Sequence, residues 1–108
     1  MAQPTLDVFQ VIADPSRRQI LQLLSKDSLT INTLAENFAI SRPAVSKHIR
    51  LLHEAGFISI RDIGRERYCT LRQEGFKELQ QWINHFDGFW VSKLQKLEAL
   101  LSKKMNNQ

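Results

Sequence analysis

Residues 41–71 combine a capped amphipathic helix with a short β-hairpin, without any linker between them. Ser41 is a residue type that caps helix N-termini, and Gly56 supplies the conformation in which many helices end. At 100° per residue, residues 42–55 separate into an apolar arc and a polar arc. The polar arc holds Arg42, Ser46, Lys47, Arg50 and Glu54, and the apolar arc holds Ala44, Val45, Ile49, Leu51, Leu52 and Ala55.

A β-hairpin is predicted directly after this helix. Residues 57–63 and 66–71 read as two strands, and Gly64 and Arg65 supply the turn between them. The hairpin tip is therefore basic, and it lies close in sequence to the basic helix.

Three shorter helical segments precede the capped helix. A stripe within residues 6–12 ends before Asp14, which can cap a helix that begins at Pro15. A third helix is expected from Thr30. Two short helices with a tight connection, followed by a hairpin, predict a mainly α winged helix-turn-helix fold. We expect one domain over residues 1–108, with the helix-turn-helix at 30–56, the wing at 57–71 and a C-terminal dimerisation helix at 73–105.

Length and composition exclude several other classes of protein. A chain of 108 residues favours a single domain. Its one cysteine cannot form an internal disulfide. No apolar run approaches the roughly 18 residues of a membrane span, so we expect a cytoplasmic protein without a membrane partner. With no glycine-rich phosphate loop and no nucleophile beside a base, we expect neither an enzyme nor a cofactor.

The positive charge is concentrated in the middle of the chain. The net charge is +4, and residues 41–72 hold seven basic and three acidic side chains. An excess of arginine suits phosphate and guanine, so double-stranded DNA is the expected partner, although a solvated charged face is the alternative. The capped helix could enter a major groove while the hairpin tip follows the backbone or the minor groove. The candidate contacts are Ser41, Arg42, Ser46, Lys47 and Arg50 on the helix and Arg65 and Arg67 on the hairpin.

Several motifs resemble the ArsR-type winged-helix transcriptional repressors of bacteria over nearly the whole chain. The resemblance implies a homodimer that binds a palindromic operator and blocks transcription. It also implies that Arg42, Pro43, Ser46 and Lys47 face the bases. The motifs that carry it are Asp14-Pro15-Ser16-Arg17-Arg18 with Ile20-Leu21, Ser41-Arg42-Pro43-Ala44-Val45-Ser46-Lys47-His48-Ile49 with Leu52, Ala55-Gly56-Phe57-Ile58, and Gly64-Arg65-Glu66-Arg67-Tyr68.

The chain departs from the metal-sensing members that it resembles. Thr30 and Asn32 stand where such sensors place a Cys-x-Cys pair. In the last helix His85 and Asp87 are too few for a zinc site, which usually has four ligands. We therefore expect no metal, and the sequence does not identify a small-molecule effector.

The C-terminal segment carries an apolar stripe that the remaining chain is too small to cover. We expect a second copy of the chain to cover this stripe, and we expect Phe9 of the first helix to belong to the same dimer interface. We also expect Gly88 to interrupt or bend the C-terminal helix. The alternative is a pocket for an apolar effector, lined by Trp82, Phe86, Phe89 and Trp90. The stripe consists of Leu79, Ile83, Phe86, Trp90, Leu94, Leu97 and Leu101.

Other functions and other residue roles also fit the sequence. A winged helix could instead serve as a protein–protein adapter that binds no DNA. His48 is expected to pack or hydrogen bond within the helix pair, with base contact as the alternative. Cys69 is expected to be a buried small hydrophobe and not a redox switch. Arg17 and Arg18 could contact phosphate or pair with Asp14 and nearby acids.

Overall fold

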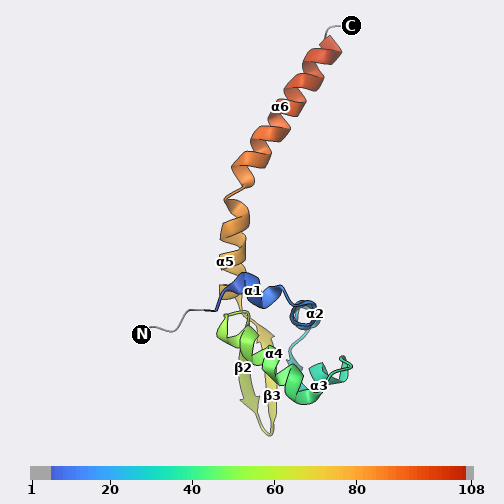
Figure 1. Ribbon diagram of the computed structural model, residues 1–108, viewed down its shortest axis with the longest axis vertical. Coiled ribbons are helices and arrows are strands. Elements are labelled where there is room, and N and C mark those ends of the chain that lie inside the picture. The colour runs from blue at the N-terminus through green and yellow to red at the C-terminus, as the bar shows by residue number, and fades with distance from the viewer. Residues whose placement is uncertain (1–5, 107–108) are drawn as a thin grey trace, which may run out of the picture.

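The computed structural model describes residues 6–106 and has the predicted winged helix-turn-helix fold (Figure 1). Two helices, α3 (Ile31–Glu36) and α4 (Arg42–Glu54), form the helix-turn-helix, and a hairpin of β2 (Ile58–Ile63) and β3 (Glu66–Leu71) forms the wing. The elements in chain order are α1 (Val8–Ile12), α2 (Pro15–Leu24), β1 (Leu29–Thr30), α3 (Ile31–Glu36), α4 (Arg42–Glu54), β2 (Ile58–Ile63), β3 (Glu66–Leu71), α5 (Gln73–Asn84) and α6 (Asp87–Asn106).

Polar side chains begin the helices where the sequence predicts them. Asp14, Thr30 and Ser41 each accept a hydrogen bond from an amide of the first turn, at 2.7, 3.0 and 3.3 Å. Such a cap is typically worth about 1 kcal/mol, because it satisfies an amide that has no partner inside the helix. These caps fix the starts of α2, α3 and α4.

The sheet has three antiparallel strands in the order β1-β3-β2. In the hairpin Ile58 lies opposite Leu71 and Ile63 lies opposite Glu66, with Gly64 at a positive φ of 64° in the turn. The sequence did not predict β1, whose two residues are too few to show a strand pattern.

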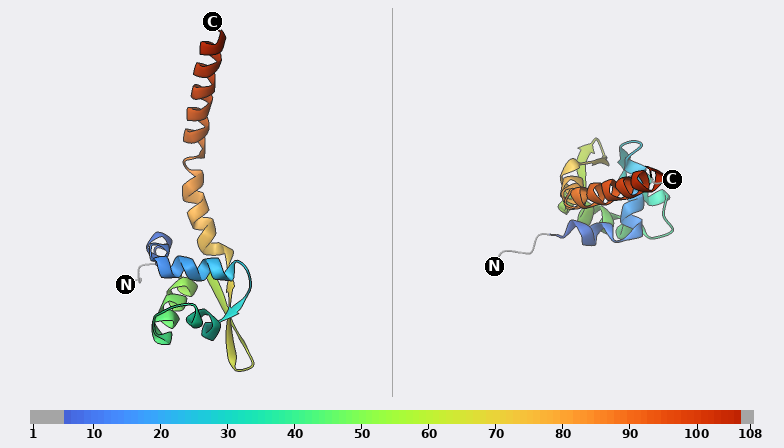
Figure 2. Two further views of the ribbon diagram at one scale, coloured as in Figure 1. Left: turned by 90° about the vertical axis from the view of Figure 1, so that its right-hand side faces the viewer. Right: turned by 90° about the horizontal axis from the view of Figure 1, so that it is seen from above.

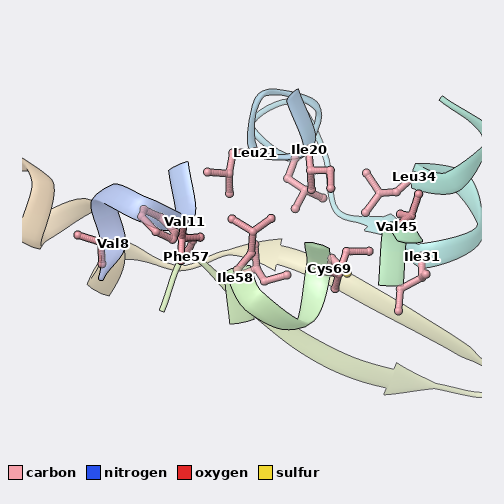
Figure 3. Close-up of a cluster of buried hydrophobic side chains, with 13 residues drawn as sticks. Val8, Val11, Ile20, Leu21, Ile31, Leu34, Val45, Phe57, Ile58 and Cys69 are labelled. Carbon is pink, nitrogen blue, oxygen red and sulfur yellow. The ribbon is translucent and has the colours of Figure 1, made fainter. Parts of the chain in front are cut away.

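The hydrophobic core joins the first four helices to the sheet (Figure 3). Gly56, with a φ of 85°, ends α4 and turns the chain so that Phe57 and Ile58 enter this core. The buried apolar side chains are Val8, Val11, Ile20, Leu21, Leu24, Ile31, Leu34, Val45, Ile49, Leu52, Phe57, Ile58 and Cys69. This packing fixes α4 and the wing to one rigid support.

The C-terminal segment is two helices, whereas the sequence predicts one over residues 73–105. The interruption lies at His85 and Phe86, two residues before Gly88, where the sequence analysis expected an interruption or bend. Gly88 itself lies in the first turn of α6. The Phe86 amide donates to the Ile83 carbonyl at 3.0 Å, three residues back, so the four-residue helical pattern stops there.

Helix α6 extends away from the other elements, at the end of the molecule opposite the wing (Figure 2). The molecule therefore measures 72 × 38 × 24 Å. Within residues 6–106, no helix combines the length and the hydropathy needed to span a lipid bilayer.

Candidate nucleic-acid interface

Helix α4 has one face anchored in the core and one face open to solvent. Val45, Ile49 and Leu52 are at most 1% exposed, which fixes the rotation of the helix about its axis. The candidate contacts on the opposite face are held outward: Ser41, Arg42, Pro43, Lys47 and Arg50 are exposed, and Ser46 is half-buried. The structure thus places the predicted polar face where an extended ligand could reach it.

The side chain of Arg42 is positioned by a hydrogen bond to a residue that the sequence did not indicate as part of the DNA-binding surface. Asn32 on α3 accepts a hydrogen bond from Arg42 Nε at 2.7 Å through its side-chain oxygen. The two residues lie on different helices, so only the packing of α3 against α4 shows the pair. The bond leaves the outer nitrogens of the guanidinium free to bind another group.

The β2–β3 wing lies beside α3 and α4 at one end of the molecule (Figure 1). It carries two further basic side chains. Arg65 follows Gly64 in the turn, and Arg67 lies on β3; both are exposed. Across the hairpin, Asp62 Oδ1 lies 3.2 Å from Arg67 Nε, and both side chains are more than 60% exposed. The ion pair is therefore well solvated and contributes little to stability.

Two hollows lie between the helix-turn-helix and the wing. The larger, of about 680 Å³, has Lys47 and Arg50 on one side and Arg67 on the other. The smaller, of about 200 Å³, is lined by Arg42 together with Arg65 and Arg67. The two hollows therefore bring together all five of the basic side chains that the sequence selected from the helix and the hairpin.

The charge of this surface is largely unopposed by acidic side chains. Arg67 is paired with Asp62. Across residues 6–106, salt bridges of up to 4.0 Å do not involve the other candidate cations, which are Arg42, Lys47, Arg50 and Arg65. A row of exposed cations along a helix and a neighbouring hairpin suits the phosphates of a polyanion.

Arg17 and His48 contact each other beneath this surface. Arg17 Nη1 lies 3.2 Å from His48 Nδ1, and the Arg17 side chain is only 15% exposed. Arg17 also lies 4.0 Å from Asp14, as one of the two open interpretations expects. His48 thus hydrogen bonds to α2, whereas the sequence analysis expected its contact within the α3–α4 pair.

Neither the lone cysteine nor the acidic and histidine side chains suggest a chemical site. Cys69 is fully buried, as predicted, and burial raises the pKa of its thiol to about 11. In the described residues no three His, Cys, Asp or Glu side chains gather closely enough to hold a metal ion.

The candidate dimerisation residues divide into two groups. Leu79 is half-buried and packs on the core of its own chain, because α5 begins against that core. The others are exposed large hydrophobics, between 37% and 60%: Phe9, Ile83, Phe86, Trp90, Leu94 and Leu97. Phe9 of α1 packs edge-to-face on Trp82 of α5, with 5.3 Å between the ring centroids. The exposed faces of these two helices are therefore continuous.

Comparison with known proteins agrees with this arrangement. Residues 14–59, which include α2 to α4, match the family described as "Bacterial regulatory protein, arsR family". The chain is 36% identical over 80 residues to the transcriptional repressor SdpR of Bacillus subtilis, with 74% of this chain and 89% of that protein covered.

Solved structures show the same fold. The crystal structure of the ArsR family transcriptional regulator RHA00566 has a TM-score of 0.72 and 34% identity, covering 78% of this chain and 92% of that one. A homodimeric winged helix-turn-helix DNA-binding domain from Mycobacterium bovis has a TM-score of 0.60 and 20% identity, and the match covers 74% of this chain and 77% of that one. The chain belongs to the ArsR family of bacterial regulatory proteins and is a DNA-binding transcriptional regulator.

Proposed function

We propose that the protein is a repressor that binds a palindromic operator as a homodimer, with one α4 helix in the major groove of each half-site. The single observation that carries this proposal is the α4 surface itself. Its apolar face is buried at Val45, Ile49 and Leu52, so its polar face is presented outward with the wing arginines beside it. The name of the relative in Bacillus subtilis supports repression.

The candidate side chains fall into three roles. Arg42, Ser46 and Lys47 lie in the first half of α4, the part of a recognition helix that reaches base edges, and they select the sequence. Arg50, Arg65 and Arg67 lie farther along the helix and on the wing, where they bind phosphates. Ser41 and Pro43 begin the helix, and they orient its first turn toward the groove.

The homodimer is supported by an apolar surface that residues 6–106 of one protomer leave uncovered. Trp90, Leu94 and Leu97 of α6 are each more than half exposed, and the exposed surface continues through Phe86 and Trp82 to Phe9. Side chains of this size are normally covered, since burial of apolar surface is worth about 25 cal/mol per Å². A two-fold axis through this surface would also pair two α4 helices about one DNA turn, ~34 Å, apart.

Selection of bound duplexes from a random library would test the proposal. The expected product is an inverted repeat whose half-sites are one helical turn apart. Lys47→Ala should change the preferred bases, whereas Arg65→Ala should weaken all duplexes alike and lower the salt dependence by about one counterion. Lys103→Ala, at the far end of α6, is the matched control for loss of a positive charge.

Two results would count against the proposal. If the selected sequences contain a single half-site, or none, then the palindromic homodimer is wrong. If Lys47→Ala and Arg65→Ala both bind as Lys103→Ala does, then the assignment of α4 and the wing as the DNA-binding surface is wrong.

A further inference from the structure

The Arg17 guanidinium closes the C-terminal end of α1. Its Nε donates to the carbonyl of Val11, and its Nη2 donates to the carbonyl of Gln10 at 3.4 Å. The last carbonyls of a helix have no partner inside it, so a positively charged donor is favourable at this end. Arg17 itself belongs to α2, which means that the side chain fixes α1 to α2.

The remaining part of the same guanidinium reaches the recognition helix. Arg17 Nη1 lies 3.2 Å from His48 Nδ1, across 31 positions of sequence. Arginine has donors and no acceptor, so His48 Nδ1 must accept this hydrogen bond and the imidazole proton must be on Nε2. His48 directly follows Lys47, one of the proposed base contacts. A shift of α4 relative to α2 that breaks the Arg17 bond would move Lys47 as well.

All three nitrogens of the Arg17 guanidinium are thus engaged within the protein. The side chain is 15% exposed, which leaves it poorly placed for a DNA phosphate. Arg18, the next residue, is exposed and closes the same end of α1 by donating to the carbonyls of Ile12 and Ala13, at 2.7 and 3.0 Å. Among the hydrogen bonds of the described residues, none joins Arg18 to α4.

We propose that Arg17 is a positioning residue that ties the recognition helix to the helix that carries the dimer contact Phe9. The inference rests on the proposed function, because it takes α4 as the DNA-reading helix and α1 as part of the dimer interface. The Arg17–His48 bond sets the orientation of α4 relative to the two-fold axis. Two half-sites one turn apart are then read together only while the bond is in place, since a shift in one protomer is repeated by symmetry in the other.

Substitutions at His48 test the Arg17–His48 bond while the positive charge of Arg17 is kept. His48→Leu removes the acceptor, whereas His48→Asn keeps an acceptor, because its side-chain oxygen occupies the place of Nδ1. A hydrogen bond to a charged donor contributes enough that its loss changes an equilibrium constant about 10-fold or more. His48→Leu should therefore weaken binding of the duplex selected by the wild type about 10-fold or more, and His48→Asn should restore it to within about threefold.

The second readout is binding to a random-sequence duplex. It should change by less than about twofold in His48→Leu, because the phosphate contacts are left in place. A merely structural defect would instead lower both affinities and the melting temperature together, and that result would overturn the inference.

A double-mutant cycle then separates positioning from direct base contact. Arg17→Lys and His48→Leu should be non-additive for the selected duplex, since each breaks the same bond. Arg18→Ala with His48→Leu is the matched control and should be additive, because Arg18 closes the same end of α1 without contacting His48. Additive effects of Arg17→Lys and His48→Leu would mean that His48 acts independently, for example at a base, and would overturn the inference.

The failure of this inference is distinguishable from the failure of the proposed function. If the wild type selects no inverted repeat, then the proposed function fails. If the wild type selects one and the Arg17–His48 cycle is additive, then the function stands and only the positioning role is wrong.

Discussion

Gly75 on α5 lies against Phe57 so closely that the contact leaves no room for a side chain on the glycine. A Cβ at Gly75 would lie between 2.7 and 2.9 Å from three atoms of the Phe57 ring. Phe57 is fully buried, and the Gly75 amide donates to the Gly56 carbonyl at 2.9 Å. Neither the ring nor the helix can easily move aside. This contact fixes the point at which the helix pair α5 and α6 leaves the domain.

Gly75→Ala should therefore destabilise the protein by about 1–3 kcal/mol, as overpacking of a core does. The loss should appear in urea unfolding as a lower midpoint. Gly88→Ala is the matched control, because a Cβ there meets nothing within 4 Å and lies in a helix. It should leave stability unchanged or raise it by about 0.5–1 kcal/mol. Equal losses in the two variants would contradict this assignment of the contact.

The Asp62–Arg67 pair predicts a substitution that strengthens DNA binding. Asp62 is the acidic side chain of the larger hollow and lies 3.2 Å from Arg67. Asp62→Asn removes a charge that repels phosphate and releases Arg67, while the exposed pair contributes little to folding. We expect about a two- to fivefold tighter complex with random-sequence duplex at low salt, measured by fluorescence anisotropy. Glu98→Asn on α6 removes the same charge away from the wing, and an equal gain in that variant would contradict the prediction.

The order of elements was predictable because local chemistry marks where most of them begin. Asp14, Thr30 and Ser41 each cap a helix, and Gly56 ends α4 at a positive φ. Each of these signals acts within four residues, so it can be read along the chain. The burial of the α4 apolar face followed from its 3.6-residue period.

Features that depend on tertiary contacts were not predictable. The bonds from Arg42 to Asn32 and from Arg17 to His48 join residues that are 10 and 31 positions apart, and no pattern in the sequence pairs them. Leu79 continues the apolar stripe of α5, yet it packs on its own core, since only the fold shows where that core ends. The break at His85 and Phe86 lies two residues before Gly88, so the glycine indicates a break in this region but not its position.

The exposed stripe of α6 predicts that Leu94→Glu weakens the dimer. Leu94 is 60% exposed in one protomer, and a carboxylate buried in an apolar interface is strongly unfavourable. Sedimentation equilibrium should show a shift toward monomer, and binding to an inverted repeat should become weaker than binding of the wild type. Gln95→Glu introduces the same charge 100° around the helix and should leave the dimer intact. Dissociation in both variants would mean that charge alone, and not burial, governs association.

Asp14 predicts a loss of stability in acid. Partial burial acts to raise the pKa of the Asp14 carboxyl, but hydrogen bonds from the amides of Ser16 and Arg17 and the charge of Arg17 outweigh it, so the pKa lies below its ordinary value of 3.8. The folded state therefore binds the proton less readily than the unfolded state does. The stabilising contribution is complete above the ordinary pKa and is lost as the pH falls through the lower, folded value. Asp14→Asn keeps a capping oxygen without a charge, so urea midpoints of the two proteins should converge below about pH 4. A constant difference down to pH 2 would contradict this reasoning.

Cys69 predicts the opposite dependence, a loss of stability in alkali. Burial raises the pKa of the thiol to about 11, above the 9.0 of a solvated cysteine. The folded state holds the proton more tightly, so ionisation of the unfolded chain draws the equilibrium toward unfolding as the pH rises from about 9 to 11. A shift of this size corresponds to roughly 3 kcal/mol. Cys69→Ala should remove that pH dependence at the cost of a small cavity.

The buried Cys69 thiol should also be unreactive in the folded protein. Because only the thiolate attacks disulfides, the native protein should react slowly with Ellman's reagent at pH 8 and rapidly in urea. Rapid reaction of the folded protein, together with loss of DNA binding after mild oxidation, would instead identify Cys69 as a redox switch.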